Sequence, residues 1–70
     1  MEGESKGIGW AVKQLQHGLK VTRRGWNGPG QYLALDDGKH FVWIRTVQDR
    51  FVPWTCSQTD LLAMDWEVVL

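Results

Sequence analysis

The chain has 70 residues and one cysteine, Cys56, and this combination limits what it can fold into. A domain this short buries only about 60% of the surface that its unfolded chain exposes. Small domains usually compensate with a disulfide, a structural metal or self-association. A single cysteine cannot form an internal disulfide, and together with His17 and His40 it shows no zinc-ligand spacing. The sequence therefore predicts one domain over residues 1–70 that gains stability by self-association.

The charges of the chain are balanced, with eight Lys and Arg residues against eight Asp and Glu residues. Proteins that bind nucleic acid mainly through its phosphates need a surplus of cations, so general nucleic-acid binding is disfavoured. No apolar run approaches the roughly 18 residues of a membrane span. The first ten residues, MEGESKGIGW, lack the apolar core of a signal peptide. We therefore expect a cytoplasmic protein without a membrane segment.

Apolar periodicity predicts the elements of the fold. Ile8, Ala11, Val12, Leu15 and Leu19 have helical spacing, and Gly18 is a natural helix stop. Extended segments separated by turn residues follow at 20–23, 31–35, 40–47, 51–52 and 66–70. Ser57 is placed to cap a second helix, with Asp60 three residues later as in a capping box. The expected class is α+β: a small antiparallel sheet packed against one N-terminal helix, with a second short helix before the last strand.

Five tryptophans stand in this short chain, at positions 10, 26, 43, 54 and 66. A small core cannot easily hide five indoles and provide an acceptor for every indole N–H. We therefore expect some of them to line a pocket or a subunit interface. Phe41 and Trp43 share one strand face, and core packing is the expected role of both.

Trp26 and Trp54 are the tryptophans with the most polar surroundings. Trp26 precedes Asn27, and Trp54 lies shortly before Ser57, Gln58 and Asp60. A flat aromatic ring beside amides, hydroxyls and a carboxylate suits a planar heterocycle, which stacks on the ring while the polar groups contact its edge. The alternative, in which the tryptophans pack in the core or an interface and the polar residues only cap a helix, stays open.

Chemistry of other kinds has no positive signal in the sequence. The glycine pairs at 7–9 and 28–30 do not extend to a phosphate-loop motif, although the 28–30 loop could form an anion nest. Cys56 has no recognisable pairing with a base, and Asp36-Asp37-Gly38 is typical of a hairpin turn. The prediction is a protein that is not an enzyme and needs no metal or cofactor.

Two separated motifs resemble a known family. The first runs from Gly18 to Gly30 and contains Arg23 and Gly25-Trp26-Asn27-Gly28; the second, over residues 52–67, contains VPW, SQTDLLA and DWE. In this order they resemble the second type of Thoeris anti-defence protein, a family of small phage and prophage proteins. The resemblance extends from about Ile8 to Val69. Many relatives have an extra segment where this chain has only residues 36–40, and the shorter loop removes pocket wall.

The resemblance implies a function. Family members are sponges that sequester a cyclic nucleotide immune signal unbroken, chiefly a cyclic ADP-ribose isomer and in some members a cyclic dinucleotide. They form homo-oligomers, typically tetramers, with ligand pockets at subunit interfaces; for this chain a dimer stays open. The expected location is the cytoplasm of a bacterial host cell. The alternative function is a small phage protein–protein interaction module that inhibits a host factor through exposed tryptophans.

The resemblance also suggests roles for individual residues. Trp26 and Trp54 become the base-stacking residues. Arg23 and the backbone around Gly28 become candidates for phosphate. The remaining candidates for hydrogen bonds to the ligand, or for shaping the pocket, are Asn27, Ser57, Gln58 and Asp60.

Overall fold

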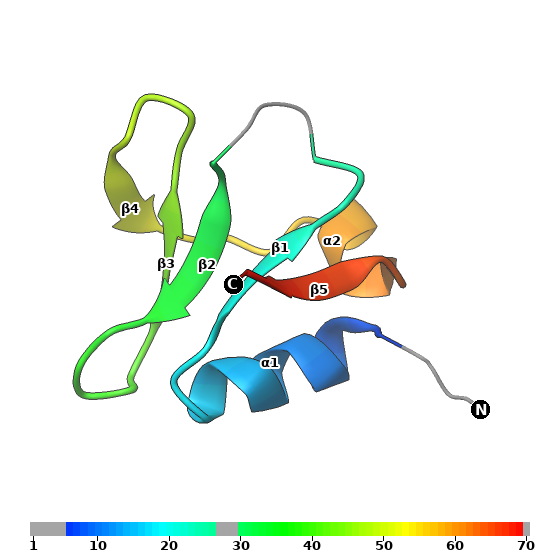
Figure 1. The fold of residues 1–70 in the computed structure, drawn as a ribbon, viewed down its shortest axis with the longest axis horizontal. Helices are drawn as coiled ribbons and strands as arrows, with labels where there is room; N and C mark the ends of the chain where they lie inside the picture. The colour runs from blue at the N-terminus through cyan, green and yellow to red at the C-terminus, as the bar shows by residue number, and fades with distance from the viewer. Residues whose placement is uncertain (1–5, 27–29, 70) are drawn as a thin grey trace.

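The computed structural model describes residues 6–26 and 30–69 and has an α+β fold, as predicted (Figure 1). Its strands form one antiparallel sheet in the order β4-β3-β2-β1-β5. Along the chain the elements are α1 (Ile8–Gln16), β1 (Lys20–Arg23), β2 (Tyr32–Leu35), β3 (Val42–Arg45), β4 (Phe51–Pro53), α2 (Gln58–Leu62) and β5 (Trp66–Val69).

Helix α1 ends just before Gly18, as the sequence predicts. The last helical residue is Gln16, and Gly18 has a φ of +86°, a left-handed conformation that glycine adopts without steric cost. Leu19 therefore lies beyond the helix and is exposed, as is Val12. Of the five residues with helical spacing, Ala11 and Leu15 are fully buried.

The core lies on one face of the sheet. Val21 pairs with Leu33 on one side and with Val68 on the other, so these side chains share a face. Helix α1 packs against β1, β2 and β5 on this face and lies below β5 in Figure 1. Among the described residues, the fully buried core consists of Ala11, Leu15, Val21, Leu33 and Trp66.

The opposite face carries aromatic side chains and is called the open sheet face below; it includes Tyr32, Phe41, Trp43 and Phe51. The rings of Phe41 and Trp43 lie 4.8 Å apart, and those of Tyr32 and Phe51 lie 6.1 Å apart. Phe41 is 44% exposed and Phe51 is 53% exposed. The expectation that Phe41 and Trp43 pack in the core is wrong, because neighbouring Val42 and Ile44 point to the core instead.

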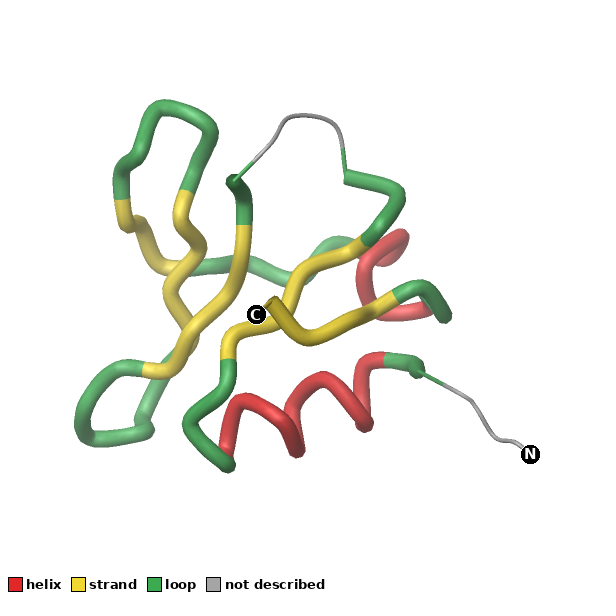
Figure 2. Tube along the Cα trace, in the orientation of Figure 1, coloured by secondary structure: helices red, strands yellow, loops and turns green. Residues whose placement is uncertain are grey.

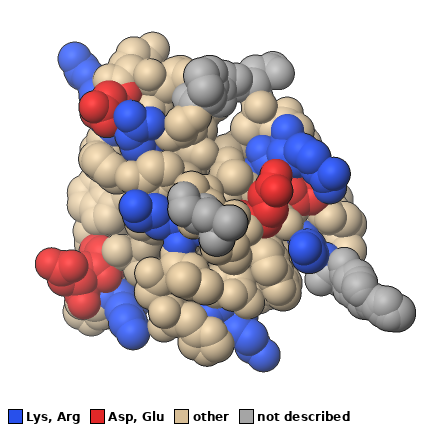
Figure 3. Space-filling model, viewed as in Figure 1, with Lys and Arg blue, Asp and Glu red and all other residues tan. Residues whose placement is uncertain are grey.

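The two sides of the molecule differ in structure. Figure 2 shows the β2–β3–β4 hairpins on one side and helix α2, next to the ends of β1 and β5, on the other. Figure 3 shows cationic and acidic side chains interspersed on the face viewed. Within residues 6–26 and 30–69, no helix is long and apolar enough to cross a membrane.

Candidate functional site

Helix α2 begins where the sequence predicts. The Ser57 hydroxyl oxygen accepts a hydrogen bond from the Asp60 backbone N–H at 3.1 Å, which satisfies one of the free donors of the first turn. The Asp60 carboxylate has a different task from the one that a capping box assigns. Its Oδ1 atom accepts hydrogen bonds from Arg23 Nη1 at 2.9 Å and from Trp26 Nε1 at 3.0 Å. Asp60 therefore connects α2 to the end of β1.

Arg23 lies between two carboxylates. Besides Asp60, it binds Asp65, with Nε 2.7 Å from Oδ1 and Nη2 3.5 Å from Oδ2. Asp65 Oδ2 also accepts the Gly25 backbone N–H at 2.8 Å. A Cβ atom at position 25 would lie 2.9 Å from that oxygen, so any other residue there would require the Asp65 side chain to shift. We call Arg23, Trp26, Asp60 and Asp65 the arginine cluster; it joins β1, α2 and the start of β5.

The charges of the arginine cluster stabilise one another. Hydrogen bonds from Arg23 and from the Gly25 N–H hold the pKa of Asp65 below its ordinary value despite some desolvation. Burial alone would raise the pKa of Asp60, but hydrogen bonds from Trp26, Arg23 and Ser57 outweigh burial and lower it. Bonds to Asp65 and Asp60 raise the pKa of Arg23. All three groups are therefore ionised at neutral pH, and one arginine against two aspartates leaves the cluster with one net negative charge.

The two tryptophans predicted to stack on a ligand lie against one buried indole. The ring of Trp26 is 5.5 Å from that of Trp66 at an interplanar angle of 79°, and the ring of Trp54 is 6.1 Å away at 87°. Such edge-to-face contacts are favourable for aromatic pairs. Trp66 is 1% exposed, and its Nε1 atom has no acceptor in the described part of the chain. Trp26 and Trp54 themselves are half-buried.

Comparison with known proteins identifies the family. The model of the Thoeris anti-defense 2-like domain matches residues 7–69. The chain belongs to the Thoeris anti-defense 2-like family. A curated relative, the protein "Thoeris anti-defense 2" of Bacillus phage SP01, is 33% identical over 82 residues, covering 89% of this chain and 92% of the relative. The matched region is longer than this 70-residue chain, so the relative has additional residues within it.

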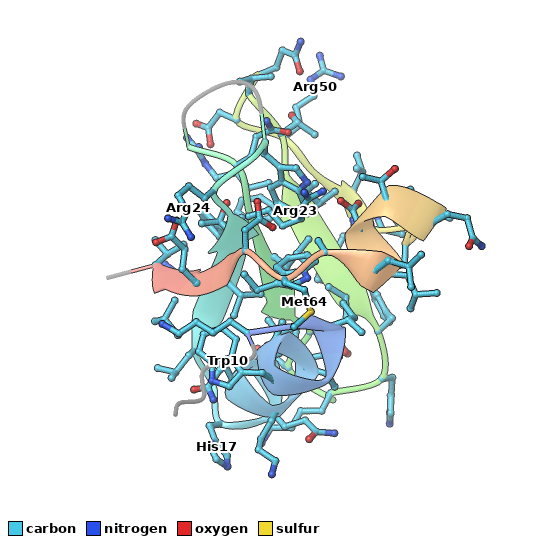
Figure 4. The ribbon with its side chains drawn as sticks, turned by 90° about the vertical axis from the view of Figure 1, so that its right-hand side faces the viewer. Trp10, His17, Arg23, Arg24, Arg50 and Met64 are labelled. Atoms are coloured by element: carbon cyan, nitrogen blue, oxygen red, sulfur yellow. The ribbon has the colours of Figure 1, made fainter. Side chains whose placement is uncertain are left out.

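The family motifs thus meet in space at the arginine cluster. Arg23 and Trp26 come from the first motif, and Asp60 comes from the second. Gln58, the first residue of α2, is exposed. Asn27 and Gly28, which the sequence also suggests as ligand contacts, lie outside the described residues. Arg24, the first residue after β1, is exposed and lies away from Arg23 in Figure 4.

Two members of this site, Asp65 and Trp66, have no role in the sequence-based prediction. Both stand in the DWE segment of the second motif, and β5 brings Trp66 opposite Arg23 in the sheet register. A signal for Asp65 was available: an arginine on a strand next to buried residues needs carboxylate partners, and a second acid follows Asp60 by five residues. The same argument does not reveal which acid binds which nitrogen.

A separate hollow of about 290 Å³ lies near the C-terminal end of α1 and the β2–β3 turn. Its lining includes Leu15, Leu35 and Asp36, and none of the predicted ligand residues. The Asp36 carboxylate is used by the turn, where it accepts the backbone N–H groups of Gly38, His40 and Phe41. These hydrogen bonds lower the pKa of Asp36, with the Phe41 bond the largest cause. The hollow and the arginine cluster are therefore distinct features.

Proposed function

We propose that this chain is a phage anti-defence protein that binds a cyclic nucleotide immune signal, a cyclic ADP-ribose isomer or a cyclic dinucleotide, and keeps it from its effector in the cytoplasm of the bacterial host. Family membership supports the anti-defence role. The structural observation that carries the proposal is the position of Trp26 and Trp54 against the same indole, next to the polar start of α2. The buried Trp66 N–H there has no acceptor within residues 6–26 and 30–69, and a buried water molecule would satisfy it.

In this proposal each residue of the site has its own role in binding the nucleotide. Trp26 and Trp54 stack on the base, a contact worth about 1–3 kcal/mol per base. Gln58 and Asp60, on α2, form hydrogen bonds with base edges or ribose hydroxyls, and Ser57 fixes the start of that helix. Asn27 and the backbone at Gly28 complete the polar contacts from the β1–β2 connection.

The proposed protein holds its ligand without changing it. The single thiol of the chain, Cys56, lies two residues before α2 and is exposed. Desolvation, followed by the charge of Asp60, raises the pKa of its thiol. A raised pKa leaves little thiolate at neutral pH, and the thiolate is the reactive form. This supports sequestration rather than catalysis.

A homo-oligomer, a tetramer or otherwise a dimer, would complete the proposed site. The open sheet face exposes Phe41 and Phe51 beside Tyr32 and Trp43, and aromatic residues are enriched at interfaces. We expect wild-type protein to sediment as an oligomer and Phe51→Glu to shift it to monomer at equal concentration. The matched control is Val47→Glu, in the β3–β4 turn; a monomeric wild type would contradict this part of the proposal.

Ligand binding and recovery test the function directly. Purified protein is mixed with cyclic ADP-ribose isomers, cyclic dinucleotides and linear ADP-ribose, and thermal unfolding is followed. A ligand that binds only the native state raises the melting temperature with its concentration. We expect such a rise for at least one cyclic nucleotide, and mass spectrometry of the denatured complex should return that nucleotide intact. An unresponsive protein, or a ligand recovered in altered form, would contradict the proposal.

A specific surface favours the second candidate, a protein–protein interaction module. Leu61, Leu62 and Met64 are 45%, 74% and 60% exposed at and after helix α2. Exposed apolar groups gathered at one place often mark an interaction site. If no nucleotide binds and Leu62→Ser abolishes capture of one defined host protein, the interaction module replaces the sponge.

A further inference from the structure

Arg23 has little capacity left for a ligand phosphate. Its side chain is 14% exposed, and it is engaged through Nε, Nη1 and Nη2. The two acceptors are carboxylates, so a phosphate brought to this guanidinium would approach Asp60 and Asp65 as well. Because the cluster is largely shielded from solvent, the repulsion between these anions is weakly screened. The one net negative charge of the cluster disfavours phosphate at this point.

Asp60, in contrast, retains capacity to accept a hydrogen bond. Arg23 and Trp26 both bind its Oδ1 atom. The Ser57 side chain adds a third hydrogen-bond interaction with the carboxylate, and the Asp60 side chain is 13% exposed. An ionised carboxylate has about four acceptor positions. Arg23, Trp26 and Ser57 are the side-chain donors to it within residues 6–26 and 30–69, so among these residues one acceptor position remains at the edge of the Trp26 indole, which the proposed function assigns to base stacking.

We infer that Arg23 is a positioning residue: it holds Asp60 beside Trp26 so that this carboxylate accepts a hydrogen bond from a neutral donor of the nucleotide, a ribose hydroxyl or an exocyclic amine, while the phosphates are bound elsewhere. The inference rests on the proposed function. It reverses the role that the sequence suggests for Arg23, from phosphate contact to support of a neighbouring acceptor.

A thermodynamic cycle separates the two roles. Affinities of wild type and Arg23→Gln are measured by NMR titration for adenosine, which lacks phosphate, and for a cyclic ADP-ribose isomer that the wild type binds. If Arg23 is a positioning residue, Arg23→Gln weakens the binding of both ligands by the same factor, about tenfold for one hydrogen bond to a charged group. If Arg23 contacts phosphate, Arg23→Gln weakens the binding of the cyclic nucleotide much more than that of adenosine, and that result would overturn the inference. Arg50→Gln, which removes an exposed cation in the β3–β4 turn, is the control for charge alone.

The donor is identified with altered nucleosides. Inosine replaces the exocyclic amine of adenosine with an oxygen, and 2′-deoxyadenosine and 3′-deoxyadenosine each lack one hydroxyl. We expect wild type to bind one of these about tenfold more weakly than adenosine, and Asp60→Asn to lose most of that discrimination. Discrimination that persists in Asp60→Asn, or a wild type indifferent to all three changes, would contradict the role of Asp60.

A spectroscopic readout controls for folding. The indole N–H resonance of Trp26 reports its bond to Asp60 without any ligand, and Arg23→Gln should shift it while the Trp43 resonance stays in place. If Arg23→Gln does not fold, Asp65→Asn, which removes the other carboxylate that holds Arg23, replaces it in the same cycle. A wild type that binds none of these nucleotides would refute the proposed function and this inference together. Unequal losses in a wild type that does bind would refute the inference alone.

Discussion

The region beside α2 and the β3–β4 hairpin contain similar residues that serve different purposes. Beside α2, an arginine, two aspartates and three indoles are half-buried or buried and contact one another. At the β3–β4 hairpin, Arg45 also pairs with an acid, Asp49, and Tyr32 also contacts a second ring, Phe51. There, however, Asp49 is 72% exposed and every residue of β4 is exposed.

This difference in burial decides how much each interaction contributes to the free energy of folding. An ion pair in water gains little, because solvent screens the charges and both side chains lose freedom. A shielded pair costs much more to break, because the remaining charge has lost its solvation. We therefore expect the α2 end to determine stability and the hairpin end to provide surface for contacts. Four substitutions or conditions test this difference.

The largest loss is expected at Trp66. Trp66→Ala removes the indole against which Trp26 and Trp54 both pack, and large-to-small changes of this kind cost about 3–5 kcal/mol. In a domain of this size, that loss should leave the chain largely unfolded by circular dichroism. Val47→Ala, at a residue 50% exposed in the β3–β4 turn, should unfold like wild type. Equal losses would refute the comparison.

Removal of Arg23 ranks second. Arg23→Gln leaves Asp60 and Asp65 without their cation, and we expect a loss of about 2–3 kcal/mol in urea unfolding at fixed protein concentration. The matched variant Arg45→Gln breaks the pair with exposed Asp49 and should cost less than about 1 kcal/mol. If Arg45→Gln costs as much as Arg23→Gln, burial does not distinguish the two ends.

Lowering the pH should remove part of the stabilisation that the ion pairs of Arg23 provide. The folded-state pKa values of Asp60 and Asp65 lie below the ordinary value of 3.8, so their contribution is complete above that pH and is lost as pH falls through the lower values. Wild type should therefore lose stability as the pH falls below about 4, measured by urea unfolding. Arg23→Gln should lose less, since the cation that lowers both pKa values is absent. Parallel pH profiles would contradict this assignment.

The smallest effect is expected at the start of α2. Ser57→Ala removes the acceptor for the Asp60 backbone N–H, at a cost of about 0.5–1 kcal/mol. Ser57→Asp, which restores an acceptor, should recover most of it. A loss unchanged in Ser57→Asp would show that the hydroxyl has another role.

The elements of the fold were predictable because their signals are local. Helical spacing places the start of α1, turn residues separate the strands, and Ser57 begins α2 as its cap. The orientation of β3 was not predictable, because Val42, Trp43 and Ile44 are all apolar and give no alternation. The register with β2, in which Ile44 lies opposite Leu33 and Val42 opposite Leu35, places both side chains on the core face.

The site was predictable in part. Trp26, Trp54 and Asp60 stood out because aromatic and polar residues adjoin there in the sequence. Their interactions could not be predicted, because Arg23 binds Asp60 and Asp65 across sequence separations of 37 and 42 residues. Contacts of this range depend on how β1, α2 and β5 pack, which no local pattern encodes.

The central claim is that the tryptophans beside α2 bind a nucleotide, and a matched pair of variants tests it most directly. Trp54 and Trp10 are both half-buried and both pack against the core, but only Trp54 adjoins α2 in the proposed site. Calorimetric titration of a cyclic ADP-ribose isomer into wild type, Trp54→Leu and Trp10→Leu compares them at equal protein concentration. We predict that Trp54→Leu binds about 5- to 150-fold more weakly, the equivalent of one stacked base, and that Trp10→Leu binds like wild type. Equal affinity of Trp54→Leu and wild type would contradict the account.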